Sequence, residues 1–113
     1  MKHANYTDVA AEEVAQGAKD TKIRWLITET DGAKTFIMRH FEVAPGGFTP
    51  LHDHAWEHEL YILSGTGAVV SAKGEEPFKP GDFVFMPGGE RHQFKNTGKE
   101  TVNMLCLIPA REK

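Results

Sequence analysis

Short runs of β-branched, aromatic and aliphatic residues, separated by glycine, proline and asparagine turns, dominate the chain after residue 22. Such runs are typical of β-strands, and their regular spacing favours a sandwich or barrel. The first two runs flank Asp31-Gly32, a dipeptide typical of hairpin turns, so we expect them to pair. The expected strands cover residues 23–28, 35–43, 59–63, 68–71, 82–86, 91–95 and 101–108.

The first 22 residues carry a weaker pattern. Asp8 is a suitable N-cap for a short helix that contains Val9 and Val14 and stops at Gly17. An extended arm is an equal alternative. We therefore divide the chain into an N-terminal arm over residues 1–22 and a single domain over residues 23–113, because a chain of 113 residues has no room for a second domain.

Four of the six histidines fall in two spaced motifs. The motifs are Gly46-x5-His52-x-His54-x3-His58-x6-Gly65 and Gly81-x5-Pro87-x-Gly89-x2-His92-x3-Asn96. Imidazole is the commonest protein donor for borderline divalent metals, and a His-x-His pair on a strand places two donors on one face. Without a metal, four converging imidazoles would each need a hydrogen-bond partner and would repel one another once protonated. The pattern therefore predicts a metal site.

The two motifs resemble those of the cupin superfamily, usually written G-x5-H-x-H-x3or4-E-x6-G and G-x5-P-x-G-x2-H-x3-N. The second motif matches at every fixed position, and in the first His58 occupies the position of the usual glutamate. Glu59 is the alternative ligand, but Gly65 would then come one residue too early. The stretch from Trp56 to Glu59 is also similar to small single-domain bacterial cupins that bind manganese through four histidines. The resemblance spans roughly residues 23 to 109.

This resemblance implies an all-β double-stranded β-helix, the cupin jelly roll, with one mononuclear metal held by His52, His54, His58 and His92. Manganese is the expected ion, with iron, nickel, copper and zinc as alternatives. Four neutral donors favour the lower oxidation state, and octahedral geometry would leave two positions open. A closed tetrahedral zinc site is the structural alternative. Similar small cupins are commonly homodimers, and we expect the N-terminal strands to pair and cover the apolar edge of residues 23–28.

Strand parity suggests which residues line the pocket beside the metal. Phe94 shares a face with the second motif's histidine, and Met104 shares a face with Cys106. Met104 and Cys106 are equally suited to plain core packing. Arg39 either points inward, where its guanidinium could hold an anionic or carbonyl-bearing substrate, or lies exposed. Trp56 either forms a pocket wall or covers the barrel mouth.

Composition and charge exclude several partner classes. A formal net charge of -3 and a pI near 6.0 give no electrostatic footprint for nucleic acid or an anionic membrane. No apolar run of about 18 or more residues occurs, and the first residues lack the apolar core of a secretory signal. The single cysteine excludes an intrachain disulfide and favours a reducing compartment. We expect a cytoplasmic protein with a small-molecule substrate and neither nucleic-acid nor membrane partners.

The function that we predict is metal-dependent oxidation of a small organic molecule, of the dioxygenase or peroxide type. The metal would hold substrate and oxidant in adjacent positions and act as a Lewis acid or redox centre. A cupin isomerase or lyase, and a non-catalytic module that binds a metal and a small ligand, are the alternatives, because the same fold carries many chemistries.

Overall fold

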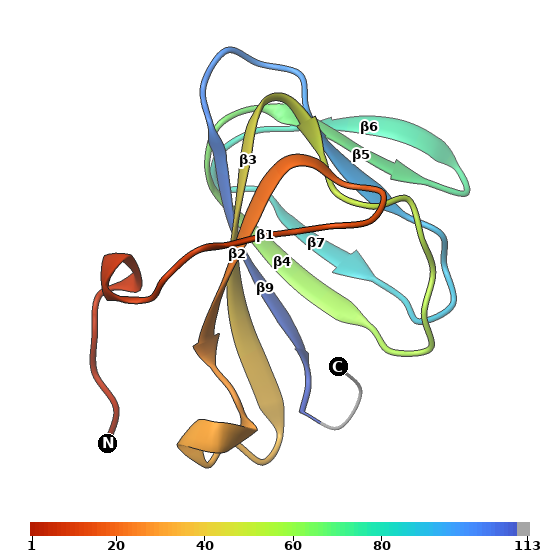
Figure 1. Ribbon diagram of the computed structural model, residues 1–113. Helices are drawn as coiled ribbons and strands as arrows, with labels where there is room; N and C mark the ends of the chain where they lie inside the picture. The colour runs from red at the N-terminus through yellow and green to blue at the C-terminus, as the bar shows by residue number, and fades with distance from the viewer. Residues whose placement is uncertain (111–113) are drawn as a thin grey trace.

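In this computed structural model, which describes residues 1–110, the chain forms one curled β-sheet with two short 3-10 turns, at Tyr6–Asp8 and Glu29–Asp31 (Figure 1). The strands are β1 Glu12–Glu13, β2 Lys19–Ile27, β3 Phe36–Phe48, β4 His58–Ser64, β5 Gly67–Ser71, β6 Gly74–Phe78, β7 Phe83–Met86, β8 Gln93–Asn96 and β9 Val102–Pro109. No helix within residues 1–110 has the length or hydropathy to cross a membrane. The predicted all-β jelly roll is confirmed.

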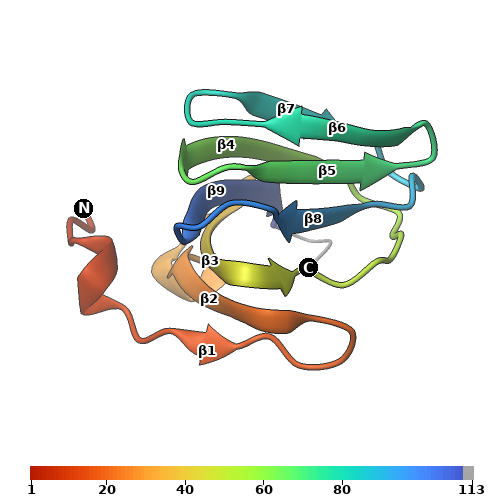
Figure 2. The same ribbon diagram turned by 90° about the horizontal axis from the view of Figure 1, so that it is seen from above.

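The sheet curls around the core, and the long strand β3 joins its two halves. The strand order is β6-β5-β8-β3-β9-β4-β7, with β2 on β3 and β1 on β2. The first part of β3 pairs with β9, whereas its last residue, Phe48, pairs with Lys95 of β8. Strands β6, β5 and β8 therefore lie across from β7, β4 and β9 (Figure 2). The space between these two halves holds the core.

Inward side chains form rows across β2, β3, β9 and β4. One row pairs Ile23 with Phe41, Phe41 with Met104 and Met104 with Ile62; the next pairs Trp25 with Arg39, Arg39 with Cys106 and Cys106 with Leu60. The first row is buried and apolar, and burial of each such side chain stabilises the fold by about 1.5–3 kcal/mol. The second row places the guanidinium of Arg39 and the thiol of Cys106 on the same inner face, so polar side chains lie next to the apolar core there.

Two turns show why particular residues are needed. β2 and β3 pair antiparallel around the predicted turn, and Gly32 adopts the left-handed backbone that ends the 3-10 turn of Glu29–Asp31. Where β5 packs beside β8, a Cβ on Gly67 would lie 2.0 Å from the carbonyl oxygen of Lys95. Any larger residue there would separate the two strands, so glycine at this position permits the close approach.

Of the two alternatives for the N-terminal segment, the extended arm is confirmed and the short helix over residues 8–17 is wrong. Glu12 and Glu13 pair with β2, and Val14 packs against the core. A helix with only two valines would bury less apolar surface than this pairing, which explains the outcome. Strand β6, Gly74–Phe78, was not predicted from the sequence, because its Glu-Glu-Pro centre lacks apolar alternation. Proline is tolerated there because β6 is an edge strand.

Candidate metal centre

A backbone bridge brings the two histidine motifs together. His52 follows β3 in the loop that leads to β4, and His92 immediately precedes β8. The amide of His52 donates to the carbonyl of His92 at 3.2 Å, and the amide of His92 donates back at 2.9 Å. His54 lies in the same loop, outside any strand. The isolated bridge of His52, and not regular strand parity, therefore sets the geometry of this His-x-His pair.

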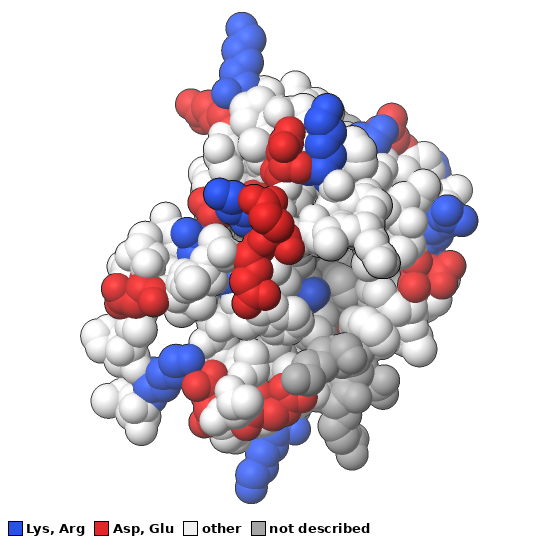
Figure 3. Space-filling model, viewed as in Figure 1, with Lys and Arg blue, Asp and Glu red and all other residues white. Residues whose placement is uncertain are grey.

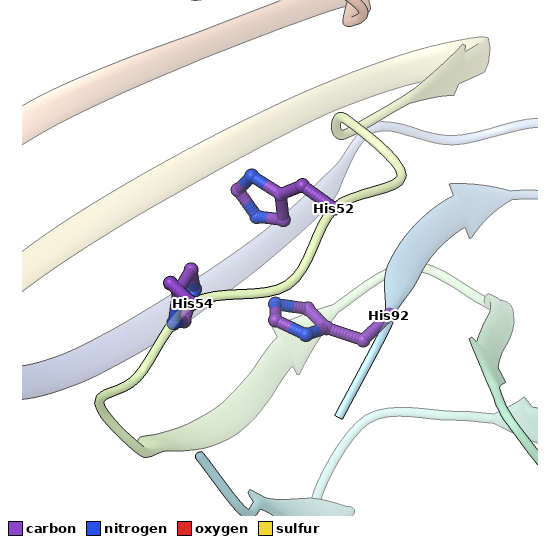
Figure 4. A group of neighbouring side chains, drawn as sticks. All are labelled: His52, His54 and His92. Atoms are coloured by element: carbon purple, nitrogen blue, oxygen red, sulfur yellow. The ribbon is translucent and has the colours of Figure 1, made fainter. Parts of the chain in front are cut away.

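Three imidazoles meet at this bridge. The candidate donor atoms of His52, His54 and His92 all lie within 4.8 Å of one another. Their ring centroids are 5.0 Å apart in each pair, and the planes are steeply inclined, so the rings surround a common space instead of stacking (Figure 4). Such a triangle of nitrogens matches the donor set of a mononuclear site for a divalent transition metal.

Hydrogen bonds to the backbone orient two of these rings. The Nδ1 atom of His54 lies 2.9 Å from the carbonyl oxygen of Trp56, and that of His92 lies 2.8 Å from the carbonyl oxygen of Glu90. Because a carbonyl only accepts, each Nδ1 carries the proton and each Nε2 presents a lone pair. Both Nε2 atoms are buried and have no hydrogen-bond partner among the described residues. A metal ion would satisfy them, so the residues fit the predicted cofactor.

His58 lies beside the three-histidine cluster on the first residue of β4. Its ring stacks on that of His54 at 4.4 Å and lies 5.1 Å from that of His92. Its Nδ1 is 3.5 Å from the sulfur of Cys106, and its buried Nε2 lacks a partner within residues 1–110. Glu59, the alternative ligand, is exposed on the opposite face of the strand. The geometry thus shows three converging histidines and places the fourth candidate next to them.

Desolvation favours the neutral form of His52, His54 and His58. Desolvation lowers the pKa of His58 to about 2, with the charge of Arg39 as the next cause. Desolvation is also the main cause that lowers the pKa of His52 and of His54, and the Arg39 charge contributes at both. A neutral imidazole is the form that binds a metal, because the lone pair is free. The lowered pKa of His52, His54 and His58 therefore favours metal binding at neutral pH.

A cavity of about 330 Å³ lies against the histidines. Its walls are mainly apolar, with Arg39 and the rim residue Glu12 as the charged side chains that line it within the described chain. On the face drawn in Figure 3, acidic side chains gather beside a recess in the surface. The lining consists of Glu12, Val14, Ile23, Trp25, Arg39, Phe41, Thr49, Pro50, His52, His58, Leu60, His92, Phe94, Met104 and Cys106.

Four of the five pocket residues singled out from the sequence line this cavity: Arg39, Phe94, Met104 and Cys106. Trp56 does not; its ring stacks on His54 at 4.2 Å with an interplanar angle of 6° and so covers the histidine cluster. Sequence analysis missed the contributions of Trp25 and Phe41 to the wall. The alternation of Ile23 with Trp25, and of Arg39 with Phe41, was the available signal.

Half-buried Arg39 and buried Cys106 form a hydrogen-bonded pair in the wall of the cavity. The Nη2 atom of Arg39 donates to the sulfur of Cys106 at 2.9 Å, and the same sulfur lies near Nδ1 of His58. Burial raises the pKa of the thiol, an effect that the Arg39 charge partly opposes. The thiol therefore links the guanidinium to the fourth candidate ligand and fixes the orientation of that ring.

Comparison with known proteins adds family relationships. A family model described as a cupin domain matches residues 39–108. Among solved structures, the polyketide cyclase RemF from Streptomyces resistomycificus is 42% identical, with a TM-score of 0.92, over 99% of this chain and 81% of that chain.

Two curated relatives are also similar. The 1-methylthio-D-xylulose 5-phosphate methylsulfurylase of Rhodospirillum rubrum is 36% identical over 65% of this chain and 47% of its own length. Auxin-binding protein 1 of Arabidopsis thaliana is 34% identical over 87% of this chain and 46% of its own. The chain thus spans about half the length of these two relatives, which differ in what their names say they do. Family resemblance alone does not select a reaction.

Proposed function

This chain belongs to the cupin-domain family, and from that premise we propose that it is a metal-dependent enzyme that converts a small organic molecule in the histidine-lined cavity. The observation that carries the proposal is the set of three buried Nε2 atoms, of His54, His58 and His92, which have no hydrogen-bond partner within residues 1–110 and lie next to an apolar cavity. Buried polar groups without partners are rare in native proteins, and such groups beside a cavity suit a functional site.

We propose His52, His54, His58 and His92 as the ligands of one divalent metal, with manganese first and iron, nickel, copper or zinc as alternatives. A bound divalent metal supplies Lewis-acid polarisation of a carbonyl oxygen. The protein supplies the rest. The apolar walls exclude bulk water, Phe94 and Met104 contact the substrate skeleton, and Trp56 shields the histidine cluster from solvent.

The reaction that we propose first is ring closure of a carbonyl-rich substrate by formation of a carbon–carbon bond within the molecule. The likeness to a polyketide cyclase over nearly the whole chain supports it. In such a closure, an enolate carbon joins a carbonyl carbon of the same molecule, and water is lost. The chain's part is to hold the molecule folded against flat side chains and to keep the enolate oxygen beside positive charge.

Oxidation of the bound molecule is the second candidate. The observation that favours it is the donor set itself, since neutral imidazoles leave the full charge on the metal and favour the lower oxidation state. Manganese or iron held in that state would supply redox chemistry with dioxygen. Non-catalytic binding of a small ligand is the alternative from a different functional class, and the likeness to auxin-binding protein 1 supports it.

Two substrate panels separate these functions. Manganese- or iron-loaded protein is incubated with linear β-polyketone thioesters, with mass and absorbance as readouts, and with catechols and phenols, with oxygen uptake as the readout. Cyclisation without oxygen uptake supports the first candidate, and oxygen uptake supports the second. His92→Ala serves as the control that lacks a ligand. If loaded protein and His92→Ala give the same background rates in both panels, the enzyme proposal fails and ligand binding takes its place.

A further inference from the structure

Arg39 is a partly buried cation near the start of β3. Its row neighbours on β2 and β9 are Trp25 and Cys106, so its side chain points into the space between the two halves of the sheet. The guanidinium carbon lies 5.1 Å from the ring centre of Phe41 and 5.6 Å from that of Trp25. The side chain is thus fixed between two aromatic rings at the wall of the cavity.

The charge of Arg39 has no carboxylate partner in the part of the chain that the structure describes. The three ion pairs found there join Lys2 to Asp31, Arg24 to Glu42 and Lys95 to Glu75. Nη2 of Arg39 donates to the Cys106 sulfur, while its buried Nε has no partner within residues 1–110. A partly buried cation with a buried, unpartnered Nε within residues 1–110 costs free energy, so its presence beside a cavity points to a ligand that supplies the charge.

The neighbours of Arg39 do not supply that charge. Cys106 offers a sulfur and not a carboxylate, and it accepts one hydrogen bond from Nη2 of Arg39. Glu12 lines the same cavity, but it is exposed on β1 and forms no ion pair with Arg39 within 4.0 Å. The remaining residues of the lining are apolar, apart from Thr49 and three histidines. An anion that enters this cavity would therefore meet one unpaired guanidinium with free N–H donors.

We propose that Arg39 binds an anionic oxygen, a carboxylate or an enolate, on a flat and largely apolar substrate. The planar guanidinium presents parallel N–H donors that match such an oxygen, and the rings of Trp25, Phe41 and Phe94 form the surfaces for the flat skeleton. The histidine donors lie on the same cavity, so the anionic end of the molecule would sit close to the metal. This inference rests on the proposed function because it names the substrate class of that site.

A matched pair of ligands tests the inference without turnover. 2-Naphthoate and 2-naphthamide share a shape and differ in charge, and calorimetry on metal-free protein measures their binding without a contribution from the metal. Wild-type protein should bind the naphthoate more tightly, by about 10- to 100-fold, the range for a hydrogen bond to a charged group. Arg39→Met should abolish this preference, and Arg39→Lys should keep part of it.

Arg24→Met is the matched control, because it removes a guanidinium that already pairs with Glu42. It should leave the preference unchanged. If Arg39→Met does not fold, Arg39→Lys still tests the inference. Loss of at least part of the preference for naphthoate supports binding of the anionic oxygen by Arg39. Full retention of wild-type binding speaks against a bidentate guanidinium. Equal binding of both ligands by wild-type protein overturns the inference. A retained naphthoate preference without metal-dependent turnover would reject only the proposed function.

Discussion

Replacement of His58 and of Glu59 by alanine, one at a time, tests which of two adjacent residues is the fourth ligand. His58 is buried, with an unpartnered Nε2 beside the other histidines, whereas Glu59 is exposed on the outer face of β4. We therefore expect Glu59→Ala to bind manganese as wild type does and His58→Ala to lose most of its affinity.

The size of the effect follows from linkage. A metal that binds only the folded state at a hundredfold excess over Kd stabilises it by about 2.7 kcal/mol. An unfolding entropy of about 2.1 cal/mol/K per residue, over 113 residues, amounts to roughly 0.24 kcal/mol/K, so the melting temperature rises by about 11 °C. Loss of a residue that hydrogen-bonds a metal ligand weakens metal binding by up to about 100-fold. If His58→Ala weakens manganese binding by that factor, the same metal concentration raises the melting temperature by only about 2 °C.

Differential scanning fluorimetry with and without manganese measures this shift. Because removal of a buried ring also destabilises the metal-free fold, the quantity to compare is the metal-dependent difference within each variant. Metal content after gel filtration provides an independent check. A shift of wild-type size in His58→Ala, together with loss of the shift in Glu59→Ala, would refute the ligand assignment.

Four other outcomes are expected. As pH falls below 6.5, the unfolding free energy of the metal-free protein should fall by about 1.4 kcal/mol per pH unit because of His58. The pKa of about 2 in the folded protein means that only the unfolded chain takes up that proton. The slope of unfolding free energy against pH, measured by urea titrations, should be shallower in His58→Gln. Cys106→Ala should weaken manganese binding by about 10- to 100-fold in calorimetry, and unchanged affinity would remove its role in orienting His58. Gly67→Ala should cost about 1–3 kcal/mol in urea unfolding, since its Cβ would clash with Lys95, and a neutral result would contradict the close strand approach. Wild-type protein at micromolar concentration should sediment as a homodimer, and a purely monomeric species would contradict the proposed pairing of N-terminal strands.

The fold and the histidines could be predicted because both leave local signals. Short apolar runs with turn residues between them predicted most strands to within a few residues, and the spacing of His52, His54 and His92 predicted a cluster that the structure places within 4.8 Å. The sequence could not tell whether the first residues form a helix. Pairing of Glu12 with Ile23 decides that, and it depends on a contact between separate segments.

The inner wall of the site was predictable only in part. Strand parity made Arg39 and Cys106 candidates for the pocket but left their inward orientation open, and the contact between them depends on β3 pairing with β9 across 67 residues of sequence. Trp56 shows the opposite case, since it lies in an irregular loop where parity does not apply, and there it stacks on His54. Residues outside regular strands need the three-dimensional structure before a role can be assigned.

Water-proton relaxation of the manganese-loaded protein tests the central claim most directly. We expect about one manganese ion per chain, with rapidly exchanging water on the metal. Histidine ligands at one side of an open cavity leave coordination positions for substrate or water. The same measurement on His92→Ala should show only weakly bound manganese. A tightly held ion without exchanging water would indicate a closed structural site, and equal binding by the wild type and His92→Ala would contradict a metal centre built from these histidines.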